Sequence, residues 1–229
     1  MLTRTIRATA ATAILAASLL ATAGCSQIAA MAQPIVERTP DAASSASAAG
    51  TDAAAFESIL TQDGSVSLTA DVADDLQVTI DVWAESPKRT QEWTTTGDKT
   101  FGYAINVADY RVAEKATLDQ KRRVYLSQLS VTSTLSPAQT PGPVNFTTDP
   151  RTLVPSDAMS TDRGLLLNSF QGGLLVPEST ISQLPDGTTG ITLDFALTLS
   201  AEGSPNSDGS FSEQTIHQTL PIAIFAAQS

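Results

Sequence analysis

The chain has only one cysteine and one histidine, and these shortages exclude whole classes of site. A single cysteine, Cys25, cannot form a disulfide within the chain. Zinc and copper centres use clusters of thiolate, imidazole or thioether ligands, whereas His217 is the only histidine in the sequence. Besides the initiator, Met31 and Met159 are the only methionines. We therefore expect no metal centre of this kind and no cofactor.

Familiar catalytic motifs are also missing. The sequence has no Gly-x-Ser-x-Gly elbow, no Ser-x-x-Lys pair and no glycine-rich phosphate loop. Ile216 and Leu220 mark one face of a strand around the histidine, and His217 falls on the other, more polar face. We expect a solvated strand residue there rather than a general base or metal ligand. The sequence favours a non-catalytic protein, although its many carboxylates leave a paired-carboxylate glycosidase open.

Basic residues are scarce. The chain has 13 basic and 24 acidic residues and a formal net charge of −11. Loss of Arg4 and Arg7 with a cleaved leader would leave 11 basic residues and a net charge of −13. Such a surface repels phosphate backbones, so we expect no nucleic-acid partner. It also opposes electrostatic adhesion to anionic lipid head groups.

The first 24 residues have the organisation of an export signal. Arg4 and Arg7 precede an uncharged stretch, residues 8–24, that contains few large apolar side chains. A positive start, a short apolar middle and small residues at the end are typical of a secretory signal peptide. A membrane-spanning helix needs about 20 strongly apolar residues, so a permanent span is the weaker interpretation.

The signal ends in Thr22-Ala23-Gly24-Cys25, which resembles a bacterial lipobox. This resemblance implies a diacylglyceryl group on the Cys25 thiol and cleavage just before Cys25. The match departs from the usual pattern at Thr22, where leucine is common. The alternative is an ordinary secretory signal with an incidental cysteine. Four lysines against nine arginines, with abundant alanine and threonine, make the chain similar to actinobacterial lipoproteins.

Composition divides the remaining chain into two parts. Residues 25–55 are dominated by alanine, serine, threonine and proline, and they show no sustained hydrophobic period. Such a segment cannot bury enough surface to offset its ordering entropy, so we predict a flexible tether. An alanine-rich helix is the alternative. Residues 56–229 are long enough for one domain with a substantial core.

Apolar residues alternate with polar ones along several segments of this domain, which predicts half-buried strands. Residues 76–82, 101–107 and 191–199 show this period, and residues 124–135 show it with one phase shift that indicates a bulge. Residues 204–210 are expected to close a hairpin between the last two strands.

Many short strands separated by proline and glycine predict an all-β fold, an antiparallel β-sandwich. Strand number and spacing resemble an immunoglobulin-like sandwich, but the paired cysteines of antibody domains are absent. Two segments are ambiguous. Residues 179–184 are expected to form a single helical turn, and residues 108–123 are either a strand followed by a connector or a short helix. For the second segment we favour a strand that continues through Val112.

Four features are candidates for binding, each with a structural alternative. Residues 206–210 partly match a calcium loop, although a hairpin turn explains them better. Asp71, Asp74 and Asp75 form a small acidic cluster, which we interpret as a solvated turn. The leucine-rich pair, residues 164–167 and 173–176, is either an exposed apolar tip or two buried strands joined by a turn. The two tryptophans, Trp83 and Trp93, either stack on sugars or fill the core.

Taken together, these patterns predict a lipoprotein held by Cys25 to the extracytoplasmic face of the cell membrane. Its β-sandwich is expected to have a non-catalytic binding or structural role, with the membrane and a surface protein or a glycan as partners. Two alternatives stay open. One is a surface hydrolase acting on carbohydrate or phosphate esters, and the other is a carrier of a small ligand or carbohydrate that would need an apolar pocket near a tryptophan or the leucine-rich pair.

Overall fold

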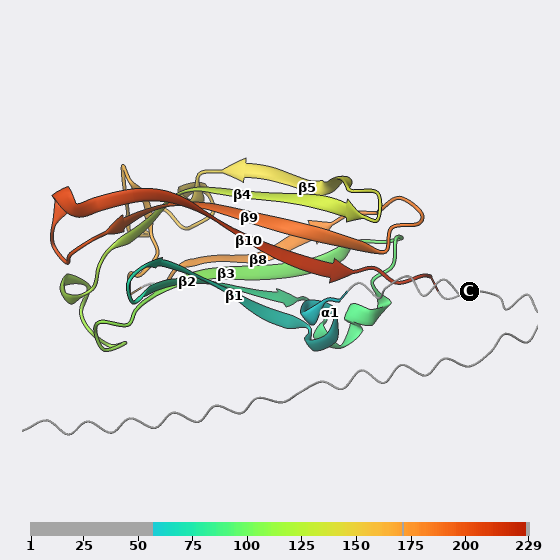
Figure 1. Cartoon of the computed structure of the whole chain (residues 1–229), viewed down its shortest axis with the longest axis horizontal. Coiled ribbons are helices and arrows are strands. Elements are labelled where there is room, and N and C mark those ends of the chain that lie inside the picture. The colour runs from blue at the N-terminus through green and yellow to red at the C-terminus, as the bar shows by residue number, and fades with distance from the viewer. Residues whose placement is uncertain (1–56, 171, 228–229) are drawn as a thin grey trace, which may run out of the picture. The chain divides into compact units, whose positions relative to one another are not determined.

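The computed structural model describes residues 57–170 and 172–227. The predicted signal peptide, residues 1–24, the predicted lipidation site Cys25 and the predicted tether, residues 25–55, lie outside the described residues. Two antiparallel sheets pack face to face in the described part (Figure 1). The prediction of an all-β antiparallel sandwich is therefore confirmed, while its immunoglobulin-like character stays a prediction.

The smaller sheet has four strands in the order β1-β2-β3-β8. The larger has the order β10-β9-β4-β7-β6, with β5 also paired to β4. The strands of the smaller sheet are β1 (Ser65–Ala73), β2 (Leu76–Ala84), β3 (Lys99–Asp109) and β8 (Leu174–Ile181). Those of the larger are β4 (Val124–Ser136), β5 (Thr140–Thr148), β6 (Ser160–Thr161), β7 (Gly164–Leu166), β9 (Gly190–Glu202) and β10 (Phe211–Ala223).

Short helical elements fill some of the connections. They are α1 (Ile59–Asp63) and the 3₁₀ turns η1 (Pro87–Glu92), η2 (Leu118–Gln120), η3 (Pro150–Thr152) and η4 (Asp208–Ser210). Ser58 caps α1, because its hydroxyl accepts a hydrogen bond from the amide of Thr61. Helix α1 closes one end of the sandwich, where the Ala223 amide donates to the Thr61 hydroxyl.

The core lies between the sheets and follows the predicted alternation. In β2 every second side chain from Leu76 to Ala84 is buried, and in β9 the same holds from Ile191 to Leu199. Each fully buried aliphatic or phenyl side chain contributes about 1.5–3 kcal/mol through removal from water. Trp93 belongs to this core, whereas Trp83 lies on the opposite face of β2.

The predicted bulge and the predicted hairpin are both present. The pairing of β4 with β9 shifts register between Leu126 and Gln128, so residues 124–135 are a strand whose apolar phase changes once. Strands β9 and β10 pair without interruption, from Glu202 opposite Phe211 to Gly190 opposite Ala223. Residues 203–210 form the loop between the two strands.

Two predictions of local structure need correction. Residues 179–181 belong to β8 and pair with β3, so the expected helical turn after Pro177 is wrong. A proline is compatible with β8 because this strand lies at a sheet edge, where a missing amide disrupts no ladder. In the segment 108–123 the strand ends at Asp109 rather than Val112, because the Asp109 carboxylate accepts bonds from the connector that follows. That connector contains the turn η2.

Prolines mark the sheet edges. Pro177 lies in β8, Pro221 in β10, and Pro141 and Pro143 in β5. The edge strand β1 contains no proline, but its Val72 carbonyl accepts a 2.7 Å hydrogen bond from the side chain of Gln214 in β10. This bond joins the two sheets along one side of the sandwich. The opposite side, between β8 and β7, is where the candidate site lies.

Candidate binding site

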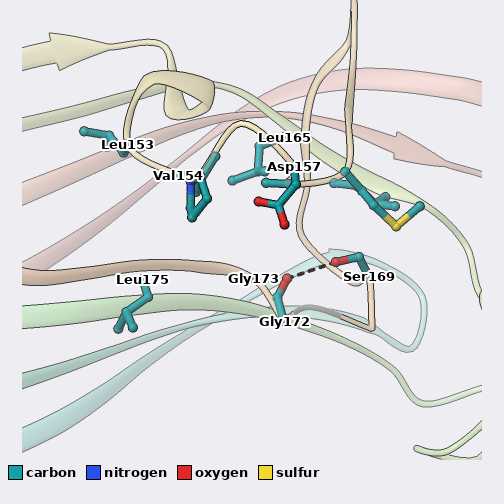
Figure 2. A pocket seen from close by; sticks show the side chains of 12 residues that line it. Leu153, Val154, Asp157, Leu165, Ser169, Gly172, Gly173 and Leu175 are labelled. Carbon is teal, nitrogen blue, oxygen red and sulfur yellow. Dashed lines mark hydrogen bonds between the residues drawn. The ribbon is translucent and has the colours of Figure 1, made fainter.

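A pocket of about 340 Å³ opens at the side of the sandwich where β8 faces β7. We call it the lateral pocket. It is lined by residues 153–155, 157–159, 172 and 173 together with Leu165, Leu166, Ser169 and Leu175. Figure 2 shows its two walls, a loop above and the edge of the smaller sheet below. The pocket lies at the leucine-rich pair that the sequence indicated.

The leucine-rich pair occupies both sheets. Residues 164–166 form β7 in the larger sheet, and the chain then crosses to β8 in the smaller sheet. Residues 165–167 are buried, as one interpretation of the sequence predicted, but Leu175 is 57% exposed. Phe170, in the crossing segment, is 88% exposed. Both interpretations therefore hold in part, since buried strands flank an exposed apolar tip.

Two glycines allow the chain to make this crossing. A side chain at Gly173 would place its Cβ 1.8 Å from the Ile105 carbonyl oxygen, and one at Gly164 would place it 2.1 Å from the carbonyl oxygen of Leu126. Gly164 also has a φ of 122°, which side chains rarely adopt. Close approach of backbone to backbone thus holds both ends of the crossing against the sheets.

The upper wall of the lateral pocket, the loop 153–159, is anchored by Arg151. The Arg151 guanidinium bonds to the Asp149 carboxylate, with a shortest distance of 2.6 Å, and its Nη1 donates to the Thr161 carbonyl at 3.2 Å. Hydrogen bonds from Arg151 lower the pKa of Asp149. Residues before and after the loop are therefore linked through one side chain, which keeps the loop over the pocket.

Apolar surface exceeds polar surface in the lateral pocket. Asp157 is the only charged residue among those that line it, and Figure 2 shows its carboxylate directed from the loop toward Gly172 and Gly173. The Ser169 hydroxyl donates to the Gly172 carbonyl at 3.2 Å. An apolar lining with a small number of placed polar groups is the usual composition of a small-molecule site.

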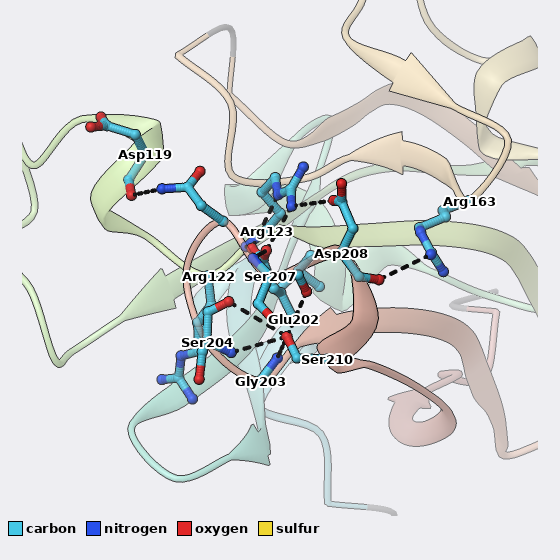
Figure 3. Close-up of polar contacts among 12 residues, drawn as sticks. Asp119, Arg122, Arg123, Arg163, Glu202, Gly203, Ser204, Ser207, Asp208 and Ser210 are labelled. Carbon is cyan, nitrogen blue, oxygen red and sulfur yellow. Dashed lines mark hydrogen bonds and ion pairs between the residues drawn. The ribbon is translucent and has the colours of Figure 1, made fainter.

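A second set of polar residues lies where β4 begins, and Figure 3 shows the contacts that Arg123 makes there with Glu202 and Asp208. We call Arg122, Arg123, Asp109 and Glu202 the arginine clasp. The buried Arg122 guanidinium bonds to both carboxylate oxygens of Asp109, at 3.0 Å from Nε and 2.7 Å from Nη2. Its Nη2 also donates to the Asp74 carbonyl at 2.8 Å. Arg122 therefore ties β4 to the smaller sheet.

The next residue, Arg123, ties the start of β4 to the hairpin of β9 and β10. Its guanidinium bonds to Glu202 at 2.6 and 3.1 Å and to Asp208 at 2.7 Å. The Ser207 amide donates to the same Glu202 carboxylate at 2.7 Å. Two consecutive arginines immediately before β4 thus hold two different parts of the fold.

The two arginines of the clasp lower the pKa values of its two carboxyl groups. Burial alone would raise the pKa of Asp109, but the hydrogen bonds from Arg122 outweigh burial and lower this pKa to about 2. Burial and Arg123 oppose each other in the same way at Glu202, whose pKa is also lowered. Both carboxylates stay charged near neutral pH, which suits a structural role.

A shallow groove of about 460 Å³ lies beside the clasp on the outer face of the larger sheet. The Arg163 guanidinium lies over the Phe211 ring at 4.3 Å, and Tyr125 contacts the same ring with centroids 5.7 Å apart. Arg123, Arg163, Asp162 and Asp208 line the groove, so its positive and negative charges balance. This arrangement selects for neither anions nor cations.

The remaining candidates from the sequence are scattered over the domain. His217 lies on the exposed face of β10, as predicted, and its Nδ1 is 3.0 Å from a carboxylate oxygen of Asp194. Trp93 fills the core, and the indole of Trp83 covers Gly102. Asp71, Asp74 and Asp75 lie at the β1–β2 turn, all exposed. None of these residues lines the lateral pocket.

Residues 206–210 form the hairpin loop with η4, in agreement with the hairpin interpretation. Among residues 57–170 and 172–227, no three histidine, cysteine, aspartate or glutamate side chains are grouped to hold a metal ion. In the same residues, no helix is both long enough and apolar enough to cross a bilayer.

Comparison with protein-family models, with curated proteins and with solved structures finds no match for this chain.

Proposed function

We propose that the chain is an extracytoplasmic lipoprotein anchored through Cys25, and that its sandwich is a non-catalytic module that binds a small ligand in the lateral pocket. The lateral pocket carries this proposal. Its volume of about 340 Å³ falls within the range of small-molecule sites, and its lining is mainly apolar. The proposed address rests on the resemblance of residues 22–25 to a lipobox.

The position of the lateral pocket supports a binding role for an anchored protein. The described chain begins at residue 57, beside α1, at the end of the sandwich formed by Gly190 and Ala223. The pocket lies toward the other end, beside the pairing of Leu126 with Leu165, ten positions along β4 from the pairing of Ser136 with Gly190. The pocket therefore lies away from α1, the first described element of the domain.

The directions in which the carboxyl pKa values are shifted favour a binding role over hydrolysis. A carboxyl group that acts as a general acid needs a raised pKa. Among the described carboxyl groups, those with a shifted pKa are all lowered, each through an arginine: Glu92, Asp109, Asp149 and Glu202. The two tryptophans lie away from the lateral pocket, which favours an apolar small ligand over a sugar.

Filling the pocket tests the proposal. We would screen small apolar compounds by the thermal shift of the full chain, its Ala158→Phe variant and a control, Ala113→Phe. Ala158 lines the pocket, whereas Ala113 is exposed in the β3–β4 connector. Compounds that stabilise the wild type and the control, but not Ala158→Phe, are expected. Identical responses of all three proteins would refute the pocket as the site.

The anchor has a separate test. Replacement of Cys25 by alanine is expected to release the protein from the membrane fraction, because the acyl chains would no longer be attached. Intact mass measurement of the wild type is expected to show a diacylglyceryl group and loss of residues 1–24. An unmodified thiol with the leader still present would contradict this part of the proposal.

A further inference from the structure

The lateral pocket continues into exposed apolar surface at its edge. Leu165 and Leu166 line the pocket and are buried, whereas Leu153 and Leu175 line it and are 38% and 57% exposed. Figure 2 shows Leu153 on the upper wall and Leu175 on the lower wall, on the same side of the pocket. We call these two leucines the apolar rim. A ligand held by Leu165 and Leu166 can therefore extend over the rim without leaving apolar surface.

Exposed apolar side chains gather at this pocket. Phe170 directly follows Ser169, which lines the pocket, and it is 88% exposed. Together with the rim it makes up three of the six large apolar side chains that are exposed in the described part of the chain. Contiguous exposed apolar surface is typical of a ligand or partner site, whereas single exposed residues need no explanation. We therefore treat the rim as part of the binding site.

Charge excludes several kinds of occupant. Among the described residues that line the pocket there is no lysine or arginine, so a carboxylate or phosphate group finds no basic partner there. The chain carries a formal net charge of −11, which repels anionic head groups and also repels a second copy of the chain. Charge complementarity therefore favours an uncharged ligand over a fatty acid, a phosphorylated lipid or a dimer contact.

The volume of the pocket limits the length of chain that it can hold. About 340 Å³ corresponds to about eleven water molecules, so the pocket holds one short chain or a single ring. A chain longer than the pocket would place its further methylenes on Leu153 and Leu175, whose exposed surface would then be removed from water. The pocket and the rim together thus suit a single hydrocarbon chain better than a compact ring, which would leave the rim uncovered.

We infer that the occupant is the single hydrocarbon chain of an uncharged amphiphile, with its end against Leu165 and Leu166 and its further part across Leu153 and Leu175. This inference rests on the proposed function, since it assigns a ligand class to the same pocket. The head group lies beyond the rim, in water, and needs no charged partner. Each methylene that enters the pocket is expected to raise the affinity about fourfold, and each one on the half-exposed rim about twofold.

A chain-length series tests this inference, with Met159 as a reporter because it lines the pocket. We would label the methionine methyl groups with carbon-13, place the full chain in phospholipid nanodiscs and titrate 1-alkanols from butanol to dodecanol, with free concentrations measured by dialysis. The affinity read from the Met159 signal is expected to rise about fourfold per methylene for the short alcohols and about twofold for the long ones. Decanoate is expected to bind more weakly than decanol, because its carboxylate is repelled.

Substitutions separate the contribution of the rim from that of the pocket. Leu175→Ser is expected to lower the affinity for decanol about fivefold and to change that for butanol less than about twofold, because only the longer chain reaches the rim. Ile59→Ser is the matched control, since Ile59 is 59% exposed in α1 and does not line the pocket. Ala158→Phe fills the pocket and is expected to abolish the Met159 response to both alcohols.

The outcomes distinguish this inference from the proposed function. Equal losses of decanol and butanol affinity in Leu175→Ser, or no loss of either, would overturn the inference while the pocket remained a binding site. Tighter binding of decanoate than of decanol would do the same. Absence of any Met159 shift with the alcohols would overturn the inference, whereas failure of the wider compound screen would overturn the proposed function.

Discussion

The arginine clasp and the lateral pocket lie at two openings of the same sandwich and differ in how each opening is filled. At the clasp, Arg122 and Asp109 meet with almost no exposed side-chain surface, and backbone donors complete the set. At the lateral pocket, apolar side chains face a space that they do not fill. One opening is therefore held closed by directional hydrogen bonds, whereas the other leaves room for a ligand.

The largest expected effect comes from breaking the clasp at its buried pair. Arg122→Met leaves the Asp109 carboxylate buried without its guanidinium, and we expect the free energy of unfolding to fall by about 3–5 kcal/mol. Urea denaturation of the full chain measures this loss. The control is Arg89→Met, which removes a fully exposed ion pair with Glu92 and is expected to change the free energy of unfolding far less than Arg122→Met. Equal costs for the two variants would contradict the role of the clasp.

Acid should weaken the same pair. The folded pKa of Asp109 is about 2, below its ordinary value of 3.8. Its contribution is therefore fully present above about pH 4 and is lost as the pH falls through 2, with a total of about 2 kcal/mol. Unfolding free energies from pH 5 to 2, compared between the wild type and Asp109→Asn, would reveal this term. A difference that does not shrink with acid would argue against it.

The lateral pocket should tolerate added volume that the core does not. Ala158→Phe places a ring where the pocket offers space, so we expect its stability to stay within about 1 kcal/mol of the wild type. Ala201→Phe adds the same ring to a buried position in β9 and is expected to cost about 1–3 kcal/mol or more. Calorimetric unfolding of both variants tests the contrast. A larger loss at Ala158 than at Ala201 would show that the pocket has no spare room.

The smallest expected effect comes from Asp208, which Arg123 also bonds but which is not a member of the clasp. The Asp208 side chain is 86% exposed where it meets Arg123, whereas that of Glu202 is buried. Asp208→Asn is expected to cost less than about 1 kcal/mol, and added salt should reduce this cost further. Urea denaturation at two ionic strengths measures both. A cost near that of Arg122→Met would place Asp208 among the essential members of the clasp.

Sequence periodicity predicted the parts of the fold that have one buried face. Residues 76–82 and 191–199 alternate because β2 and β9 lie inside their sheets with a single apolar side. Strand β8 was missed over residues 179–181, since an edge strand with a proline and exposed side chains lacks that alternation. Tertiary position, rather than local propensity, decides its conformation.

The lateral pocket and the arginine clasp were not equally predictable from the sequence. The leucine-rich pair indicated an apolar feature near residues 164–176, but the chain crossing between sheets, which creates the pocket, leaves no local pattern. The clasp was not predicted, because Arg122 and Asp109 are separated by a connector, and Arg123 and Glu202 lie 79 positions apart in the sequence. Adjacent arginines immediately before a buried strand were the available signal.

The prolines on β5, β8 and β10 have a consequence for protein held at high density on a surface. When two copies of the domain approach edge to edge, each of these three strands presents a proline, which has no amide hydrogen. On the edge strand β1, the Val72 carbonyl already accepts a hydrogen bond from Gln214. Intermolecular strand pairing is interrupted at those points, so crowded molecules are protected against merging into fibrils.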